Sequence, residues 1–484
     1  MKTNEDAFQY EHSLDHCVEF FSKAGSIYDN DNYRFYGNNE DILSLFQRAW
    51  ITNKEVAFKL LLWVRDCRGG AGNRSGFRKC IKWLANKPED YKWVVENIKL
   101  IPKYGRWDDM KSLFNTKVEK SAVYEWVEEL LENNILAAKW ANRKDIPLYL
   151  ELKKASIVRN IGDFRRYLAK LRKDHIVESK MCSKNFNKIN YENVPSVAMA
   201  RYTNAFNTND KDRFLSYKES LIKGNTKINA DVLFPYDCVR TYENGDRDIA
   251  NAQFDALPNY MNDENVLVLA DTSGSMCASI GAGKITAYDV SRSLALYCSG
   301  KLPKENPFYK KFIQFKSESE FSDWEGLKFS DALNNHHIFN GACGGTRIDK
   351  ALNLILKTGK MFKVADVNMP SMLLICSDMQ FSVGISNNYV GQKGIKEQNI
   401  EQLTEIEKCL REFDKEGYTR PQIVYWNLVP YYGQPDTVDS KNVSLVSGFS
   451  PSILKSILAC EYFSPVTVMM KTLEKYDEGL TIPK

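Results

Sequence analysis

Apolar residues between positions 41 and 135 recur every three or four residues, in short segments separated by polar turns. Such spacing predicts a succession of α-helices, each with one buried face. Repeated helices of about 10–15 residues are typical of a stacked, HEAT-like solenoid. Longer and more basic helical segments continue to about residue 225. We therefore expect an all-α HEAT-like module over residues 41–262, preceded by an N-terminal extension over residues 1–40.

The pattern changes in residues 263–484, where apolar runs of strand length alternate with amphipathic helical segments. Strands are predicted at Val266–Ala270, Met372–Ser377 and Ile423–Leu428. Alternating strands and helices of these lengths predict an α/β domain with a parallel, doubly wound sheet. The Ser-, Asn- and Gly-rich segment 382–398 is predicted to be a loop. The fold class is thus multidomain, with a helical solenoid followed by an α/β domain.

Oxygen-bearing side chains follow two of the predicted strands. Asp271, Ser273 and Ser275 come directly after the first, Thr346 precedes a later helix, and Asp378 ends the second strand. Carboxylates and hydroxyls are hard donors that suit Mg²⁺ or Mn²⁺. Because ligands of open α/β sheets bind at the carboxyl ends of strands, these residues form a candidate metal site. The alternative is that Asp271 and Ser273 only cap the following helix.

The Asp-x-Ser-x-Ser sequence at 271–275, together with Thr346 and Asp378, resembles the metal-ion-dependent adhesion site (MIDAS) of a von Willebrand factor A domain. The resemblance implies a bound divalent ion with one coordination position open. It further implies that a protein partner offers a carboxylate to that position.

Basic residues concentrate in one part of the helical half. Residues 138–188 contain 14 Lys and Arg against 5 Asp and Glu, a local charge of +9. Such a surface is a candidate phosphate-binding region, although many basic helix faces are only solvated. The candidate RNA-binding residues are Arg65, Arg68, Arg74, Arg78, Lys139, Trp140, Arg143, Lys144, Arg165, Arg166, Lys170, Arg172 and Lys173. Arg65 could instead form a structural ion pair, and Trp140 could pack in the hydrophobic core between helical repeats.

The helical half also resembles a known family. The segments Leu62–Gly70, Tyr104–Asp109, Ala137–Trp140 and Val194–Met199 are similar to those of a TROVE-related family of uncharacterised proteins. That family is distantly similar to the Ro autoantigen ribonucleoproteins, and the C-terminal segments Val424–Leu428 and Leu445–Ser450 extend the likeness. The resemblance implies binding of RNA, as single-stranded ends or structured non-coding RNA.

Several classes of protein are disfavoured by the sequence. The five histidines have no catalytic or metal-ligand spacing, so we expect no enzyme. The 11 cysteines form no C-x-x-C pair, and no apolar run begins the chain or approaches membrane-spanning length, which favours a cytoplasmic protein without membrane contact. Two hypotheses remain: an RNA-binding protein with a metal-dependent partner, and a scaffold whose helical groove binds a polypeptide while the metal binds an acidic partner residue.

Overall fold

A computed structural model describes residues 15–27, 41–66, 68–173, 176–230, 233–261, 264–277, 285–314, 319–339, 348–379, 406–429, 442–448, 453–458 and 464–483. Up to residue 261 these residues are helical. The longer helices of this module are α1 (His16–Ala24), α2 (Ile42–Thr52), α3 (Lys54–Arg65), α4 (Arg74–Asn86), α7 (Glu119–Leu131), α9 (Ile146–Lys154), α10 (Ile161–Arg172), α12 (Ser196–Asn209), α13 (Lys211–Ile222), α14 (Pro235–Glu243) and α15 (Arg247–Asp255). Shorter ones are α5 (Tyr91–Glu96), α6 (Leu100–Tyr104), α8 (Ile135–Trp140), α11 (Val177–Cys182) and the 3₁₀ helix η2 (Trp107–Leu113).

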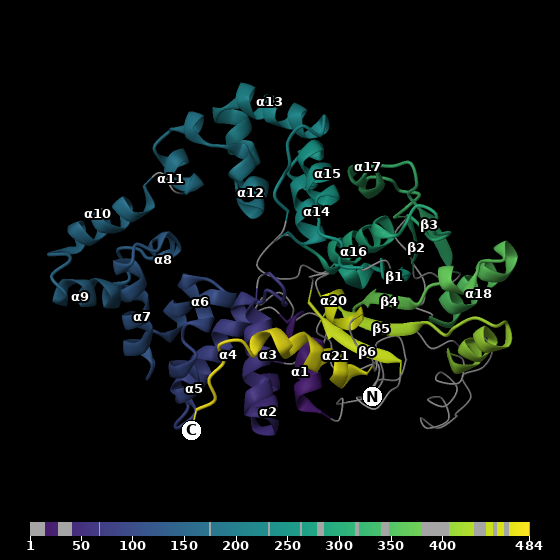
Figure 1. Ribbon diagram of the computed structural model, residues 1–484, viewed down its shortest axis with the longest axis horizontal. Coiled ribbons are helices and arrows are strands. Elements are labelled where there is room, and N and C mark those ends of the chain that lie inside the picture. The colour runs from purple at the N-terminus through teal and green to yellow at the C-terminus, as the bar shows by residue number, and fades with distance from the viewer. Residues whose placement is uncertain are drawn as a thin grey trace.

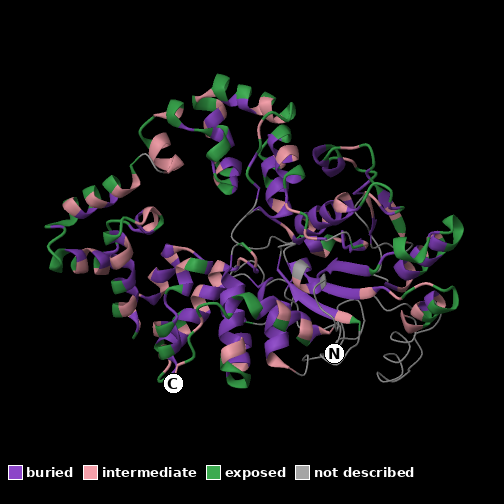
Figure 2. Ribbon diagram, in the orientation of Figure 1, coloured by how far each residue is buried: buried purple, intermediate pink, exposed green. Residues whose placement is uncertain are grey.

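The helical module forms an arch that touches the C-terminal domain at both ends (Figure 1). It starts at α1, which contacts the C-terminal domain, and returns through α14, which also contacts it. Buried residues of α12 and α13, among them Phe206 and Phe214, form a separate hydrophobic cluster. Buried residues from α1 to α10 belong to the main core. Figure 2 shows the strands largely buried and α9–α13 with many exposed residues.

The C-terminal domain contains a six-stranded sheet in the order β3-β2-β1-β4-β5-β6. The strands are β1 (Val266–Ala270), β2 (Lys311–Gln314), β3 (Glu320–Asp323), β4 (Met372–Ser377), β5 (Gln422–Asn427) and β6 (Val443–Ser447). The accompanying helices are α16 (Ala287–Lys301), α17 (Phe329–Leu333), α18 (Ile348–Phe362), α20 (Ile453–Leu458) and α21 (Pro465–Leu473). Central strands β1 and β4 are buried along their whole length, as their uninterrupted apolar runs predict.

The prediction of a parallel sheet is confirmed for five strands and is wrong at one edge. β1, β2, β4, β5 and β6 are parallel, but β3 pairs antiparallel with β2, with Phe312 opposite Ser322. β3 has the sequence Glu-Phe-Ser-Asp, whose two acidic residues have low strand propensity. A short, charged strand at an edge protects the sheet from pairing with further strands. Because its sequence is half acidic, β3 could not be recognised as a strand from its apolar pattern.

The N-terminal helix packs directly on the edge strand β6. The hydroxyl of Ser447 donates to the carbonyl oxygen of Phe21 at 2.7 Å and accepts from the N–H of Gly25 at 3.0 Å. Phe20 and Phe21 have no exposed surface. Residues 15–27, within the predicted N-terminal extension, are therefore part of the core, and the edge of the sheet is covered.

The C-terminal segment crosses back onto the helical module. Asp66, after α3, accepts hydrogen bonds from Lys475 Nζ at 2.6 Å and from the hydroxyl of Tyr476 at 3.0 Å. Further along, Asn97 and Thr481 exchange two hydrogen bonds of 2.7 Å. Both ends of the described chain thus join the two modules, and we expect the modules to unfold together.

Replacing Gly25 with alanine tests the contact between α1 and β6. A Cβ at this position would lie 2.5 Å from the backbone nitrogen of Gly448, so helix and strand must separate. We expect Gly25→Ala to lower the free energy of unfolding by about 1–3 kcal/mol, as overpacking does. Gly162→Ala is the control, because its Cβ would meet only the side chain of Asn160. Equal stability of Gly25→Ala and wild type in urea unfolding would contradict this packing.

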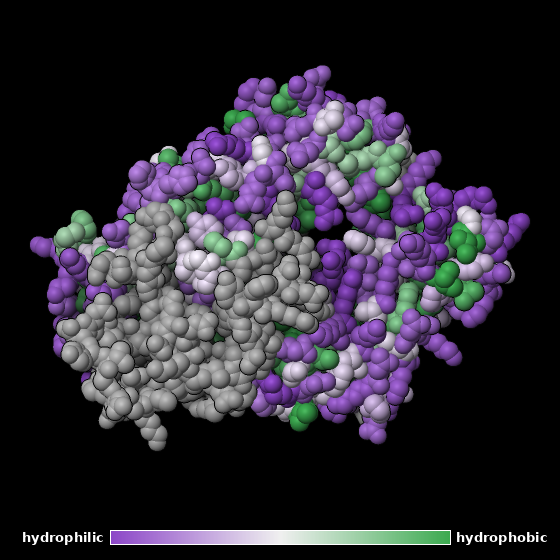
Figure 3. All heavy atoms as spheres, turned by 180° about the vertical axis from the view of Figure 1, so that it is seen from behind, coloured by the Kyte–Doolittle hydropathy of each residue, from purple (hydrophilic) through white to green (hydrophobic). Residues whose placement is uncertain are grey.

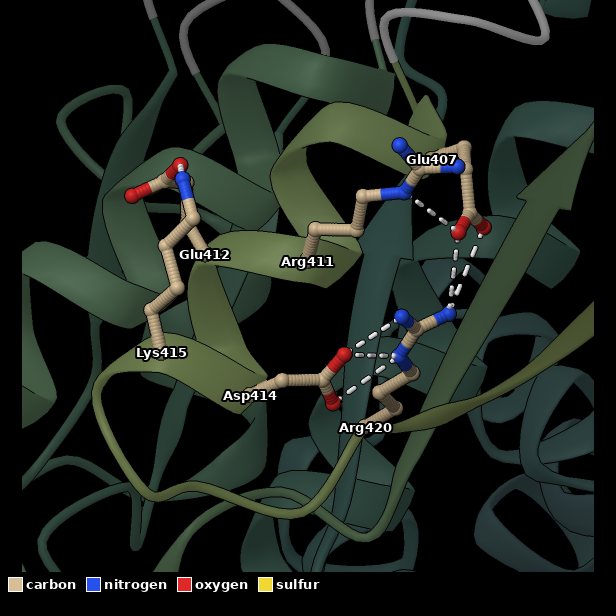
Figure 4. Close-up of polar contacts among 6 residues, drawn as sticks. All are labelled: Glu407, Arg411, Glu412, Asp414, Lys415 and Arg420. Carbon is tan, nitrogen blue, oxygen red and sulfur yellow. Dashed lines mark hydrogen bonds and ion pairs between the residues drawn. The ribbon is translucent and has the colours of Figure 1, made fainter.

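A helical segment at 406–415 leads into β5 and is held by an arginine (Figure 4). Arg420 donates through Nε to both carboxylate oxygens of Asp414, at 3.0 and 2.9 Å, and through Nη1 to Glu407 at 3.3 Å. Exposed ion pairs of this kind contribute little stability each, so their effect is mainly to orient the segment. The predicted loop 382–398 lies outside the described residues. None of the described helices has the length and hydropathy that a membrane crossing needs.

Candidate functional sites

The predicted metal ligands that the structure describes lie at the carboxyl ends of β1 and β4. Asp271 follows β1 and Asp378 follows β4, and the N–H of Asp271 donates to the carbonyl oxygen of Cys376 at 2.9 Å. From β1 the sheet continues through β2 on one side, and from β4 through β5 on the other. This is the point where strand order reverses, which is where open α/β sheets bind their ligands.

Hydrogen bonds fix the orientation of the Asp271 carboxylate. Its Oδ2 accepts from the hydroxyl of Ser377 at 2.7 Å, and its Oδ1 accepts from the N–H of Ser273 at 3.0 Å. Asp271 and Asp378 are each 1% exposed. Burial raises the pKa of Asp271, and the hydrogen bonds from Ser273 and Ser377 act in the opposite direction. Two buried carboxyl groups therefore share one small region.

The two serine hydroxyls have a spacing that fits a small divalent ion. Ser273 Oγ and Ser275 Oγ are 3.0 Å apart. Adjacent oxygen ligands of an octahedral Mg²⁺ are about 2.9 Å apart, given metal–oxygen distances of about 2.0–2.1 Å. Within the described residues no three His, Cys, Asp or Glu side chains are grouped to hold a metal. The candidate site depends instead on hydroxyls and two carboxylates, and Thr346 lies outside the described residues.

Four candidate RNA-binding residues line one concave surface of the helical module. A pocket of about 600 Å³ is formed by α4, η2, α8 and α10 with the turn after α8. We call it the basic pocket; it is lined by Arg78, Asp108, Lys111, Ser112, Lys139, Trp140, Ala141, Asn142 and Arg172. Its four cations come from parts of the chain almost a hundred residues apart, so their convergence is a property of the fold.

Three of the four cations in the basic pocket have carboxylate partners. Arg78 pairs with Asp108 at 2.7 Å, Lys111 with Asp145 at 3.1 Å and Lys139 with Glu178 at 3.0 Å. Burial alone would raise the pKa of Glu178, but hydrogen bonds from Lys139 and Tyr202 contribute to a pKa below the usual value. The Lys139–Glu178 pair joins α8 to α11, which α9 and α10 separate in the sequence.

Arg172 is the cation of the pocket without such a partner. Its Nε donates to the carbonyl oxygen of Leu168 at 3.0 Å, and within the described part of the chain no carboxylate lies within ion-pair distance. Burial lowers the pKa of Arg172 because the guanidinium has lost part of its hydration. The Arg172 guanidinium is thus half-buried without a counter-charge among the described residues. Nearby, the Trp140 ring has the Arg106 guanidinium 5.0 Å from its centroid.

The remaining candidates lie elsewhere. Arg65 is 2% exposed and pairs with Asp109 at 2.6 Å. It therefore forms a buried structural ion pair, which was the alternative to RNA binding. Arg68 donates to the carbonyl oxygen of Lys103 at 3.3 Å, and Arg74 is half-buried at the start of α4. The others are exposed around α9 and α10: Arg143, Lys144, Arg165, Arg166, which pairs with Asp163, Lys170 and Lys173.

Sequence reasoning missed Lys111, Ser112 and Arg106. A usable signal was present, because Trp107, Met110 and Leu113 are the buried apolar positions of η2. Their spacing of three residues leaves Lys111 and Ser112 off this apolar face of the 3₁₀ helix. The prediction was based on the excess of basic residues in 138–188, and η2 was not considered because it is short and contains both acidic and basic residues.

Comparisons with known proteins identify relatives without an assigned activity. Residues 3–145 and 147–266 match the family model described as a domain of unknown function, DUF2828, and residues 265–479 match that of a second, DUF7788. An uncharacterised protein of Acanthamoeba polyphaga mimivirus is 25% identical over 524 aligned positions, covering 95% of this chain and 85% of the relative.

Among solved structures, the crystal structure of the Deinococcus radiodurans Ro (RSR) protein is similar to this chain with a TM-score of 0.49 and 10% identity. The alignment covers 96% of this chain and all of that one.

Proposed function

This chain belongs to the DUF2828 family of proteins of unknown function, and we propose that it is an RNA-binding protein whose α/β domain binds a divalent cation. The helical module holds the RNA, and the cation recruits a protein partner through a carboxylate. The main support for RNA binding by the helical module is that four cations line one pocket beside Trp140: Arg78, Lys111, Lys139 and Arg172.

The contents of the basic pocket match what single-stranded RNA offers. Phosphates bind Lys and Arg side chains that share a surface, and unstacked bases bind aromatic or guanidinium planes. Arg172 supplies a guanidinium that has no carboxylate partner among the described residues, and Trp140 supplies a half-buried ring. Lys139 and Lys111 can exchange their carboxylate partners for phosphate oxygens. Exposed cations on α10, including Arg165 and Lys170, extend the positive surface beyond the pocket.

The cation proposal rests on the switch-point position of Asp271 and Asp378 and on the 3.0 Å spacing of the two serine hydroxyls. The hydroxyls of Ser273 and Ser275 would hold the ion, and the two carboxylates would balance its charge. Mg²⁺ and Mn²⁺ both suit such oxygen donors. When bound, the ion supplies a coordination position for a carboxylate of a partner.

One observation favours the protein scaffold as a second candidate. Helix α9 buries Leu148 and Leu152 on one side, while Ile146 and Leu150 on the other are 43% and 48% exposed. A helix that is apolar on two sides is usually covered on both. At the right-hand edge of Figure 3, hydrophobic residues gather among hydrophilic ones at this end of the module. An aliphatic surface suits a polypeptide better than a phosphate backbone.

Salt dependence distinguishes the two candidates at the level of single residues. RNA affinity should fall linearly with the logarithm of salt concentration, with a slope of about −0.7 per phosphate contact for single strands. We expect Arg172→Gln and Lys139→Gln each to reduce this slope by about 0.7 in anisotropy titrations with a labelled single-stranded RNA. Lys120→Gln, an exposed lysine on α7 outside the pocket, is the matched control.

The outcomes separate the proposals clearly. A reduced slope in the two pocket variants and not in Lys120→Gln supports RNA binding in the basic pocket. Equal slopes in all variants, each with wild-type melting behaviour, would place the RNA elsewhere. Replacing Arg165, Arg166 and Lys170 together by glutamine tests the outer face of α10 in the same assay. No RNA binding at low salt would favour the scaffold.

A further inference from the structure

A second pocket of about 600 Å³ lies where the helical module meets the α/β domain, and its lining contains none of the candidate metal-binding or RNA-binding residues. Its walls come from α13 and α15 on one side, and from the end of α16 and the segments flanking β2 and β3 on the other. Small-molecule sites have volumes of about 300–1,000 Å³ and are frequent at domain interfaces. We call it the lysine pocket, after Lys301, Lys310 and Lys328 in its lining.

The walls of the lysine pocket are held together by direct contacts between the modules. The rings of Phe254 and Phe329 stack with centroids 4.1 Å apart. Asn251 accepts from the N–H of Ser330 at 2.9 Å and donates to its hydroxyl at 3.1 Å. Gly300 lets Trp324 pack closely, because a Cβ there would lie 2.9 Å from the indole ring. These contacts fix the two walls of the pocket relative to one another.

The lysines are positioned by uncharged groups. Lys301 Nζ donates to the carbonyl oxygen of Leu257 at 2.8 Å, and Lys310 Nζ donates to that of Leu327 at 3.0 Å. Lys310 Nζ also lies 4.2 Å from the centroid of the Trp324 ring. Among the described residues, no carboxylate lies within ion-pair distance of these two ammonium groups or of Lys328. Many other lysines of this chain have such partners, whereas here three lysines face two aspartates, which leaves the lining with a net charge of +1.

The partial burial of Lys301 and Lys310 also favours an anion as the ligand of this pocket. Burial lowers the pKa of both Lys301 and Lys310, and the attraction of Asp255 for each ammonium does not offset the loss of hydration. An anion entering the pocket would replace the missing water and stabilise the charged lysines. Ammonium groups bind phosphate as point charges, and a cluster of them suits a doubly charged phosphate better than a single carboxylate.

Two carboxylates, Asp248 and Asp255, also line the pocket and restrict which anions fit. They repel a polyanion such as RNA but accept hydrogen bonds from hydroxyl groups. Tyr309 and Trp324 add aromatic surface for an organic group. We propose that the lysine pocket binds a small phosphate ester with hydroxyl groups, such as a mononucleotide or a sugar phosphate. This site is independent of the basic pocket and of the cation site.

Titration calorimetry of the full chain with AMP, with ribose 5-phosphate and with inorganic phosphate tests the proposal. We expect saturable binding of at least one ester, weakened about tenfold or more by Lys310→Gln and by Lys328→Gln, since each removes one charge-assisted hydrogen bond. Lys357→Gln, an exposed lysine on α18, is the matched control and should bind as wild type does. Lys328→Gln keeps the test valid if Lys310→Gln misfolds, because the Lys328 side chain is exposed and makes no hydrogen bond or ion pair with another described residue, while its helix-capping carbonyl is unchanged.

Three results would overturn the proposal. The first is no binding of either ester at millimolar concentration, and the second is binding that the two pocket variants leave unchanged. The third is binding of inorganic phosphate as tight as that of the esters, which would show an anion site without selectivity for an organic group. The outcome says nothing about RNA, whose affinity is measured separately with the basic-pocket variants.

Discussion

Replacing Asp109 with alanine is expected to destabilise the protein by about 3–5 kcal/mol, the range for removing one partner of a buried ion pair. Asp109 has no exposed surface and accepts from Arg65 Nε at 2.6 Å, from Arg78 Nε at 2.7 Å and from the N–H of Arg106 at 2.9 Å. Its loss leaves the Arg65 guanidinium buried without a counter-charge. Urea unfolding of the variant and wild type gives the difference.

Two further variants make this prediction specific. Asp108→Ala removes the more exposed partner of Arg78 and should cost about 1 kcal/mol or less. Arg65→Met combined with Asp109→Leu removes both charges and should recover much of the stability lost in Asp109→Ala. Equal losses for Asp108→Ala and Asp109→Ala would show that burial of the Arg65 pair does not govern the stability of this region.

Removing the carboxylate of Asp271 is expected to abolish stabilisation by Mg²⁺. A ligand that binds only the folded state adds about 2.7 kcal/mol at a concentration 100 times its Kd, so wild type should melt at a higher temperature with Mg²⁺. Asp271→Ala should melt at the same temperature with and without the ion, because one of two balancing charges is lost. Thermal melts at several Mg²⁺ concentrations, repeated with Mn²⁺, measure the effect.

Ser377→Ala is the companion variant for Asp271. It removes the hydroxyl that donates to Asp271 Oδ2 but keeps both carboxylates, so most of the Mg²⁺ effect should remain. Wild type that melts identically with and without Mg²⁺ or Mn²⁺ would refute the cation proposal. RNA affinity should be nearly the same in Asp271→Ala and wild type. A folded Asp271→Ala protein that fails to bind RNA would contradict the separation of the two functions.

The sequence predicted elements whose apolar pattern is continuous and missed those that depend on tertiary contacts. The bounds Val266–Ala270 and Met372–Ser377 agree with β1 and β4, because both runs are buried at every position and end in polar residues. α1 was missed as part of the core, because what buries it is β6, more than 400 residues away. α21 and the segment after it, which pack on α3, were missed for the same reason.

The candidate sites were predicted unequally for similar reasons. Asp271 and Asp378 could be placed together because parallel strands align their carboxyl ends. Residues such as Arg78 and Arg172 were recognised as basic, but only the packing of four helices shows that they share a pocket. Arg65 follows Leu61 and Leu62 by four and three positions, so it falls on a buried stripe of α3. A charged residue on such a stripe needs a partner in the core, and local sequence does not identify that partner, Asp109.

The absorbance ratio at 260 and 280 nm, measured on protein purified at low salt without nuclease, tests the claim of RNA binding most directly. We predict a nucleic-acid signal that a high-salt wash removes, because phosphate contacts weaken steeply with salt, and that ribonuclease but not deoxyribonuclease abolishes. A pure protein spectrum at low salt, with folded protein, would contradict RNA binding and favour the scaffold.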